Sequence, residues 1–196
     1  MKIIIPIHSE WACKILNGDK KIEVRKGLAL YNALKKAEER GEEVEFLMYV
    51  TKAKPRLAKF FDISHKPNGR LIREVEYITS IDDSSPTSFD LNGKIVAKFK
   101  AKAEEIKYEF VCDCDCEYAI VTFVTESLSQ RKLLKQSCLP YFDLRIYMGI
   151  KNERDGKSVG TALHIRDLEI FDKPKDLSDY GLKRAPQSWG YAKEAL

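Results

Sequence analysis

The sequence predicts an α+β fold with a curved or closed sheet rather than a doubly wound parallel sheet. Two observations support this prediction: strand patterns and helix patterns are interspersed along the chain, and short strand patterns dominate its middle. A third observation is size, because 196 residues with a 44% hydrophobic composition can bury one substantial core. We therefore expect a single domain over residues 1–196.

The N-terminal segment predicts a strand, a short helix and a second strand. Residues 2–7 (KIIIPI) fit a buried strand, and Pro6 places it near a sheet edge or a bend. Ser9 is the expected N-cap of the helix, and Gly18 ends it because glycine readily adopts a left-handed conformation. Residues 20–26 then alternate as a strand, with apolar side chains on one face and charged side chains on the other.

The next segment predicts a second helix and a central strand. Residues 28–40 form an amphipathic helical pattern that ends at Gly41. Residues 44–50 (VEFLMYV) are apolar on both faces of a strand, which indicates a central place in the sheet. Residues 52–69 predict an irregular basic stretch, and residues 80–93 carry turn signals and predict a loop.

The second half of the chain predicts two more strands and two more helices. Residues 93–106 have the clearest strand pattern, in which small or apolar residues alternate with lysines. Helical patterns follow near residues 126–136 and 139–148. Residues 161–171 predict the last long strand, with a local irregularity in its pattern.

The segment from Gly18 to Arg25 (GDKKIEVR) fits the pattern G-x-K-x-x-E-x-R and directly follows a short helix. This pattern resembles the signature of the ASCH family, whose fold is similar to that of the PUA domain. Residues 93–99 resemble the family's central strand, residues 137–139 resemble the middle helical region of a bacterial subgroup, and residues 172–189 resemble the ending of bacterial and phage members. The resemblance therefore covers most of the chain.

The resemblance implies a PUA-like small β-barrel of about five or six mixed strands with surrounding helices. It also implies a ligand cleft beside the G-x-K loop and a partner that is RNA or a modified nucleotide. Residues 55–90 and 107–125 are then insertions. One branch of the family resembles small amidohydrolases that act on acetylated cytidine with a lysine, a threonine and a distant glutamate. Here the lysine is Lys20, and Glu23 occupies the threonine position.

Lys20, Glu23 and Arg25 bring three charges onto one short segment. An ammonium such as that of Lys20 is a compact, strongly hydrated charge that suits a phosphate or a polarised carbonyl. The guanidinium of Arg25 can bind a phosphate or a carboxylate bidentately. Glu23 lies between Lys21 and Arg25 on one strand face, so we expect it to pair with either. We expect Lys20, Glu23 and Arg25 to converge on an open, solvent-filled pocket.

Three interpretations of this segment stay open. In the first, the charges form a structural ion-pair ladder that fixes the strand against the C-terminal tail. In the second, they line a binding cleft, where Lys20 and Arg25 contact the ligand and Glu23 orients them. In the third, Lys20 and Glu23 are catalytic, because basic neighbours lower the pKa of Lys20 and Glu23 acts as general acid or base.

The C-terminal tail carries a second polar and aromatic cluster at Gln187, Ser188 and Trp189. Glutamine and serine can read the edge of a base, and tryptophan can stack on it. The alternative is that Trp189 closes the hydrophobic core. The candidate ligand- or RNA-binding residues are Lys20, Lys21, Glu23, Arg25, Gln187, Ser188 and Trp189.

Two other basic features have two interpretations each. Lys94, Lys98, Lys100 and Lys102 form a row on one face of their strand, and this row can follow the phosphates of a single strand of RNA. The alternative is a solvated face that protects a sheet edge. The basic stretch over residues 52–70 has the same two interpretations.

Cys112, Cys114 and Cys116 would share one face of an extended strand, where zinc could accept their thiolates. The spacing is shorter than that of zinc sites, and no histidine lies nearby in the sequence. We therefore expect incidental thiols, no metal and no cofactor.

Composition narrows the class of protein. The sequence contains no run of 18 apolar residues, so we expect no transmembrane segment and no membrane partner. Five cysteines, an odd number, fit a reducing cytosol better than a secreted disulfide scaffold. A net charge of +4 permits a nucleic-acid partner without requiring one.

These observations together predict a cytoplasmic protein that binds RNA or a nucleotide-sized ligand. Its cleft would lie between the G-x-K-x-x-E-x-R segment and the P-Q-S-W tail. The alternative is a small hydrolase, either similar to N4-acetylcytidine amidohydrolases or a ribonuclease, that uses Lys20 and Glu23. A third class is an interaction module without a ligand.

Overall fold

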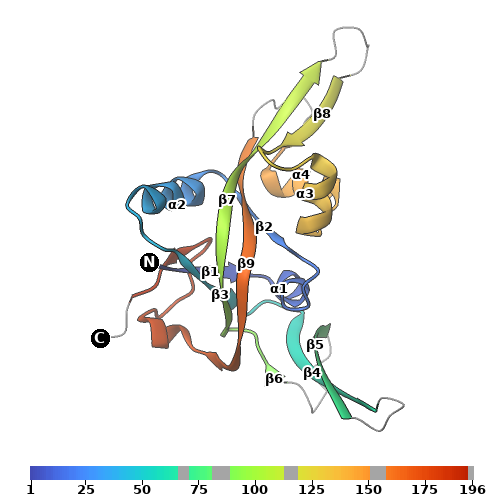
Figure 1. Ribbon diagram of the computed structural model, residues 1–196, viewed down its shortest axis with the longest axis vertical. Coiled ribbons are helices and arrows are strands. Elements are labelled where there is room, and N and C mark those ends of the chain that lie inside the picture. Colours follow the sequence, from blue (N-terminus) through green and yellow to red (C-terminus); the bar gives the residue numbers. More distant parts are fainter. Residues whose placement is uncertain (66–70, 81–88, 113–118, 151–157, 194–196) are drawn as a thin grey trace. The chain divides into compact units, whose positions relative to one another are not determined.

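The computed structural model of the protein describes residues 1–65, 71–80, 89–112, 119–150 and 158–193 (Figure 1). Its helices are α1 (Ser9–Leu16), α2 (Ala29–Glu39), α3 (Gln130–Ser137), α4 (Tyr141–Met148) and the short 3₁₀ helix η1 (Leu177–Tyr180). Its strands are β1 (Lys2–Ile7), β2 (Ile22–Lys26), β3 (Glu45–Val50), β4 (Arg56–His65), β5 (Leu71–Ser80), β6 (Phe89–Asp90), β7 (Ile95–Cys112), β8 (Ala119–Val124), β9 (Ser158–Lys175) and β10 (Gly190–Tyr191).

The described strands form one mixed sheet and one smaller antiparallel sheet, which confirms the predicted α+β class. The larger sheet has seven strands in the order β10-β1-β3-β7-β9-β2, with β8 paired to β7, and the smaller has the order β5-β4-β6. A barrel closes only when the two end strands of a sheet pair with each other. Within the described ranges β10 pairs only with Ile3 and Ile4 of β1, and not with β2. The sheet is therefore open, in contrast to the barrel implied by the family resemblance.

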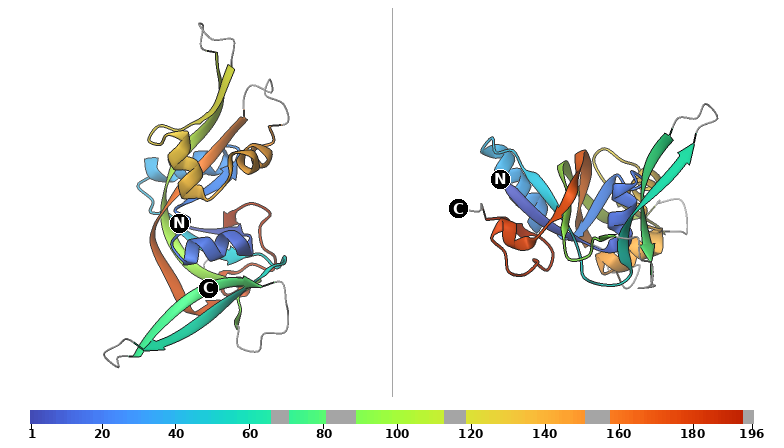
Figure 2. Two further views of the ribbon diagram at one scale, coloured as in Figure 1. Left: turned by 90° about the vertical axis from the view of Figure 1, so that its right-hand side faces the viewer. Right: turned by 90° about the horizontal axis from the view of Figure 1, so that it is seen from below.

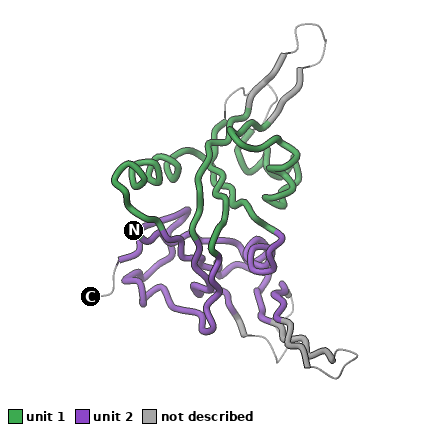
Figure 3. Tube along the Cα trace, in the orientation of Figure 1, with its two compact units in different colours: residues 1, 20–44, 100–167 green, residues 2–19, 45–99, 168–196 purple. Residues whose placement is uncertain are grey.

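The chain divides into two compact units (Figure 3). Unit 1 comprises Met1, residues 20–44 and residues 100–167; unit 2 comprises residues 2–19, 45–99 and 168–196. The long strands β7 and β9 contribute residues to both units. The expectation of one domain over the whole chain stays a prediction.

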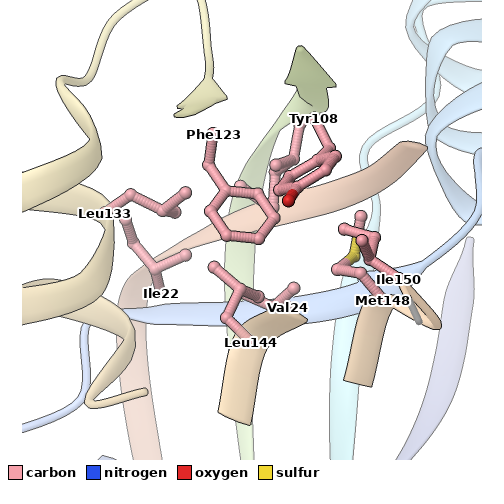
Figure 4. Packing of buried hydrophobic residues seen from close by; sticks show 10 residues of the cluster. Ile22, Val24, Tyr108, Phe123, Leu133, Leu144, Met148 and Ile150 are labelled. Atoms are coloured by element: carbon pink, nitrogen blue, oxygen red, sulfur yellow. The ribbon is translucent and has the colours of Figure 1, made fainter. Parts of the chain in front are cut away.

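The core of unit 1 is a cluster of buried apolar side chains from β2, β7, β8, β9 and the two helices α3 and α4 (Figure 4). Ile22 and Val24, two positions apart on β2, face it because side chains alternate along a strand. Tyr108 of β7 and Phe123 of β8 contact each other with ring centroids 5.0 Å apart. The cluster consists of Ile22, Val24, Ile106, Tyr108, Phe123, Leu133, Leu144, Met148, Ile150 and Ala162. Burying this face fixes β2 beneath α3 and α4.

A second apolar cluster belongs to unit 2. Ile4, Leu47, Tyr49 and Ile95 form its buried part. Partly buried side chains of the C-terminal segment pack against it: Phe171, Leu177, Tyr180, Leu182, Ala185 and Ala192. The segment after β9 is therefore anchored on β1, β3 and the start of β7.

The observed end of α1 agrees with the sequence prediction, but its start does not. Gly18 has φ +81°, the left-handed conformation expected where α1 stops. Ser9, predicted as the N-cap, is instead the first residue of the helix, and His8 precedes it without a capping hydrogen bond. The Ser9 hydroxyl donates to the carbonyl oxygen of Pro55, so a tertiary contact occupies the group that would have capped the helix.

Two further expectations have different outcomes. The central position of β3 is confirmed, because it pairs with β1 on one side and with β7 on the other. The prediction of an irregular stretch over residues 52–69 is wrong for residues 56–65, because β4 forms a long antiparallel hairpin with β5 (Figure 2). Residues 52–55 are irregular as predicted, and residues 66–69 lie outside the described residues. The charged residues of this stretch obscure the strand pattern of β4 in the sequence.

Several predictions fall on parts that the structure leaves out. Of the loop predicted over residues 80–93, residues 81–88 lie outside the described residues, as do Cys114, Cys116 and the side chain of Cys112. None of the helices in the described ranges is long and apolar enough to span a membrane.

Candidate functional site

The start of β2 is fixed between α3 and β9 by two backbone hydrogen bonds. The N–H of Lys21 donates to the carbonyl oxygen of Gln136 at 2.8 Å, and the N–H of Ile165 donates to the carbonyl oxygen of Lys21 at 2.9 Å. Lys20 directly precedes the hydrogen-bonded residue Lys21, and Glu23 lies two positions after it. The Lys20–Arg25 part of the predicted motif thus begins beside the C-terminal end of α3.

Lys20, Glu23 and Arg25 converge on one another. The Lys20 Nζ lies 3.5 Å from Oε2 of Glu23, and the Arg25 Nη2 lies 3.1 Å from Oε1 of the same carboxylate. The expected pair between Glu23 and Arg25 is present, but the lysine partner is Lys20, while Lys21 is exposed.

The sequence predicted that these charges line an open pocket, but in the structure they are buried. The side-chain exposures of Lys20, Glu23 and Arg25 are 2%, 9% and 11%. The cause is that β2 is covered on both faces, since its residues from Ile22 to Arg25 are all buried. The ion pairs therefore have the geometry of a structural cluster rather than that of an open pocket, and that cluster joins β2 to α3. The expected attachment of this strand to the C-terminal tail stays a prediction.

Lys20 also joins β2 to the end of α3. Its Nζ donates to the backbone carbonyl oxygen of Ser137, the last residue of the helix, at 2.6 Å. The last carbonyl groups of a helix lack partners within the helix, and a cation there also compensates the negative end of its dipole. Lys20 thus caps α3.

Burial changes the protonation properties of this cluster. Burial lowers the pKa of Lys20, and the neighbouring Glu23 opposes this shift. Burial raises the pKa of the Tyr147 hydroxyl on α4, although its interaction with Arg25 opposes the shift. A lysine with a lowered pKa beside a carboxylate has the chemistry of an acid–base pair, but a substrate reaches it only if the covering side chains move.

The predicted tail residues belong to unit 2. Gln187 and Ser188 are exposed, whereas Trp189 is half-buried. The Trp189 ring packs edge-on against Tyr191 with centroids 5.6 Å apart. Since the Lys20 cluster belongs to unit 1, a common cleft for the motif and the tail stays a prediction.

The lysine row on β7 is largely neutralised by acidic side chains. Lys94 pairs with Asp176 at 2.6 Å, and Lys98 lies 3.4 Å from Glu45 and 3.1 Å from Glu169. Lys100 pairs with Glu43. These ion pairs favour the interpretation of a solvated, ion-paired sheet face over a track for phosphates.

A basic surface that sequence reasoning missed lies on α3 and the ends of β2. Arg131, Lys132 and Lys135 are exposed on α3, and Lys21 and Lys26 are exposed at either end of β2. No acidic side chain in the described part of the chain forms an ion pair with any of them. The signal was present as the run QRKLLK, which combines a buried leucine with three cations.

The neighbouring helix α4 exposes large apolar side chains. Phe142 and Ile146, one helical turn apart, are 68% and 74% exposed, and Tyr147 is 43% exposed. Leu144 and Met148 occupy the opposite face and are buried in the unit 1 core. We call Lys21, Lys26, Arg131, Lys132, Lys135, Phe142, Ile146 and Tyr147 the basic–aromatic surface. Exposed cations and exposed aromatic rings are the side chains that bind single-stranded nucleic acid.

Among the described residues, no group of three or more His, Cys, Asp or Glu side chains is placed to hold a metal ion. Of the cysteines considered for zinc in the sequence, Cys114 and Cys116 lie outside the described residues, as does the side chain of Cys112. The charged groups described at the Lys20 cluster and at the basic–aromatic surface are therefore ion pairs and exposed cations.

Comparison with known proteins gives two similar solved structures. No family model matches the chain, and no curated protein matches it. The crystal structure of ASCH from Zymomonas mobilis has 13% sequence identity and a TM-score of 0.49, and the match covers 98% of this chain and 87% of that one. A serine-to-alanine mutant of the same protein has 13% identity and a TM-score of 0.48, with coverage of 98% and 88%.

Proposed function

We propose that this protein is an RNA-binding protein of the ASCH type and that single-stranded RNA binds to the basic–aromatic surface of unit 1. The resemblance of the Gly18–Arg25 segment to the ASCH signature supports the family and its expected ligand. The surface supplies the two interactions that such binding needs, phosphate attraction by cations and base stacking on exposed rings.

The observation that carries the proposal is the difference between two sets of cations. Lysines on the β7 face pair with carboxylates, so their charge is compensated within the protein. Arg131, Lys132 and Lys135 have no such partner among the described side chains, so their charge is available to phosphates. RNA releases counterions only where a protein cation neutralises one of its phosphates. Cations that are already paired within the protein therefore contribute less to this release than unpaired cations do.

In this proposal the predicted motif has two roles. Lys21, which is exposed beside the end of α3, contacts RNA directly. Lys20, Glu23 and Arg25 are positioning residues, because their ion pairs and the cap on Ser137 hold α3 in place. Gln187, Ser188 and Trp189 stay candidates for base recognition in unit 2, and the RNA affinity of Trp189→Ala tests that role.

The test is fluorescence anisotropy with a labelled single-stranded RNA of mixed sequence, over a series of salt concentrations. The triple variant Arg131→Gln, Lys132→Gln, Lys135→Gln removes three cations, and each phosphate contact on a single strand contributes about 0.7 to the salt slope. We therefore expect the slope of log affinity against log salt to decrease by about 2. Affinity at low salt should fall by at least about tenfold.

A matched control removes the same charge from the neutralised lysine row. The triple variant Lys94→Gln, Lys98→Gln, Lys100→Gln also loses three cations, but each of them is already paired. We expect its salt slope to stay close to that of the unmodified protein. Equal losses in both triple variants, or salt-insensitive binding by the unmodified protein, would overturn the proposal.

A hydrolase at Lys20 and Glu23 is the second candidate. The observation in its favour is the lowered pKa of Lys20, caused chiefly by burial, next to the Glu23 carboxylate. The test is acetate release from N4-acetylcytidine and cleavage of the labelled RNA on a gel, with Lys20→Met as the inactive control. If neither product forms, or if Lys20→Met forms as much, the hydrolase is rejected and the binding proposal is unaffected.

A further inference from the structure

Unit 2 contains a cavity whose lining includes several cations. The cavity has a volume of about 560 Å³ and lies between the strand β3, the turn before β7 and the segment after β9. Its lining residues are Tyr49, Lys52, Gly93, Asp176, Leu177, Ser178, Leu182, Lys183, Arg184 and Ala185. The charged members are three cations and one acid.

The charge of this lining is not balanced. Asp176, its acidic member, pairs with Lys94 at 2.6 Å. Lys52, Lys183 and Arg184 are exposed, and none of them forms an ion pair or a hydrogen bond within the part of the chain that the structure describes. Three uncompensated cations around one concave space produce a positive potential that favours an anion there.

A largely buried tyrosine, Tyr49, lies at the same cavity. Tyr49 is only 4% exposed and lines the cavity, and its hydroxyl forms no hydrogen bond with a described residue. Burial raises the pKa of this hydroxyl, so it stays protonated and acts as a donor. This hydroxyl can therefore donate a hydrogen bond to an acceptor oxygen of a ligand in the cavity.

Packing holds the stem of Lys52 and the backbone turn that precedes Lys183. The stem of Lys52 lies over Gly93, since a Cβ on that glycine would come within 3.1 Å of the Lys52 Cε. Leu177 and Leu182 pack on the apolar cluster of unit 2, and the N–H of Leu182 donates to the carbonyl oxygen of Leu177 at 3.1 Å. Lys183 follows directly on this anchored turn. An anchored backbone at the site lowers the entropy that is lost when a ligand binds.

We propose that this cavity binds a phosphate group, held by Lys52, Lys183 and Arg184 and by a hydrogen bond from the Tyr49 hydroxyl. A phosphate supplies several acceptor oxygens, which match the fork of an arginine, two ammonium groups and a hydroxyl donor. The site goes beyond the proposed RNA surface because all its residues belong to unit 2. The phosphate group comes from a free nucleotide or from an RNA chain, and the test separates these sources.

The first measurement is calorimetric titration with inorganic pyrophosphate. We expect saturable binding by the unmodified protein and at least a tenfold loss in the double variant Lys183→Gln, Arg184→Gln. The single variant Tyr49→Phe keeps the ring but lacks the hydroxyl, so we expect a loss of about threefold to tenfold. The control is Lys35→Gln, Lys36→Gln, which removes two neighbouring exposed cations of α2 and should bind as the unmodified protein does.

The second measurement identifies the source of the phosphate. If it belongs to an RNA chain, a 5′-phosphorylated oligonucleotide binds more tightly than the unphosphorylated one, and Lys183→Gln, Arg184→Gln abolishes the difference. If it belongs to a free nucleotide, a nucleoside monophosphate binds and the 5′-phosphate has no effect on RNA. No saturable pyrophosphate binding, or equal binding by the double variant, overturns the site.

Failure of this site and failure of the RNA surface are distinguishable. The variant Arg131→Gln, Lys132→Gln, Lys135→Gln should bind pyrophosphate normally, because these residues belong to unit 1. Normal pyrophosphate binding without RNA binding would reject only the proposed function. RNA binding without pyrophosphate binding would reject only the phosphate site.

Discussion

The ammonium nitrogen of Lys20 lies 2.6 Å from the backbone carbonyl oxygen of Ser137, 117 positions further along the chain. One side chain thereby connects the entrance of β2 to the end of α3, and both groups are buried. The same ammonium pairs with Glu23, which also pairs with Arg25. The motif that resembles the ASCH signature therefore joins β2 to the end of the basic helix α3.

Lys20→Met should destabilise the protein. The substitution leaves the buried carbonyl of Ser137 without its donor, and an unsatisfied buried acceptor costs about 1–3 kcal/mol. The neighbouring Lys21→Met is the matched control, because this side chain is exposed and its loss should change the free energy of unfolding by no more than about 0.5 kcal/mol. Urea denaturation measures both. Equal effects of the two substitutions would show that the Lys20 cap contributes nothing.

Glu104 should make part of the stability depend on pH. Burial alone would raise the pKa of Glu104, but a hydrogen bond from the Ser127 hydroxyl and the nearby His164 outweigh it and hold the pKa below its ordinary value of 4.5. A carboxyl whose pKa is lower in the folded state stabilises the protein above the unfolded-state pKa. This stabilisation is lost as the pH falls below about 4.5 and through the folded-state pKa.

The measurement compares Glu104→Gln with the unmodified protein by denaturation at a series of pH values. We expect the difference in unfolding free energy to be largest near neutral pH and to shrink below pH 4.5. Glu105→Gln is the control, because its carboxylate pairs with Lys107 at 3.8 Å near the surface and its difference should be small throughout. A pH-independent difference for Glu104→Gln would refute the linkage.

The sequence predicted correctly those features that depend on neighbouring residues, such as a glycine that ends a helix or an amphipathic helical pattern. Gly18 ends α1 in the left-handed conformation, and the amphipathic pattern of α2 buries Leu30 and Leu34. The open sheet could not be predicted in this way, since it depends on whether β10 and β2 meet. The strand β4 was missed for a different reason, because the charged residues of this stretch obscure the strand pattern of the hairpin that β4 forms with β5.

At the candidate site, too, the sequence predicted ion pairs within one strand but not ion pairs between distant segments. Glu23 and Arg25 share a strand face, so their pairing followed from alternation along β2. The sequence does not reveal which lysines are neutralised, because Lys98 meets Glu45 and Glu169 only once three strands are side by side. For this reason the row on β7 was considered as a phosphate track, and α3 was considered only as a helix.

Phe142→Ala should weaken RNA binding without weakening the fold. Phe142 is 68% exposed, so its ring contributes little to the core, whereas stacking of a base on an aromatic ring is worth about 1–3 kcal/mol. The matched substitution Phe123→Ala removes a ring that is 1% exposed and should cost about 3–5 kcal/mol of stability. Anisotropy with the labelled RNA and urea denaturation separate the two effects. Unchanged RNA affinity in Phe142→Ala would remove the stacking contact from the proposal.

Gly93→Ala should impair the phosphate site, while Gly41→Ala should not. Both glycines have positive φ, +80° and +68°, so an alanine at either position costs about 1–2 kcal/mol of stability. Only at Gly93 does the new methyl group meet a neighbour, the stem of Lys52, whereas nothing lies within 4 Å at Gly41. The methyl group pushes the Lys52 stem aside by a few tenths of an ångström, so pyrophosphate affinity should fall in Gly93→Ala alone. Equal pyrophosphate affinity in the two variants, measured by calorimetry at a temperature where both are folded, would mean that Lys52 does not hold the phosphate.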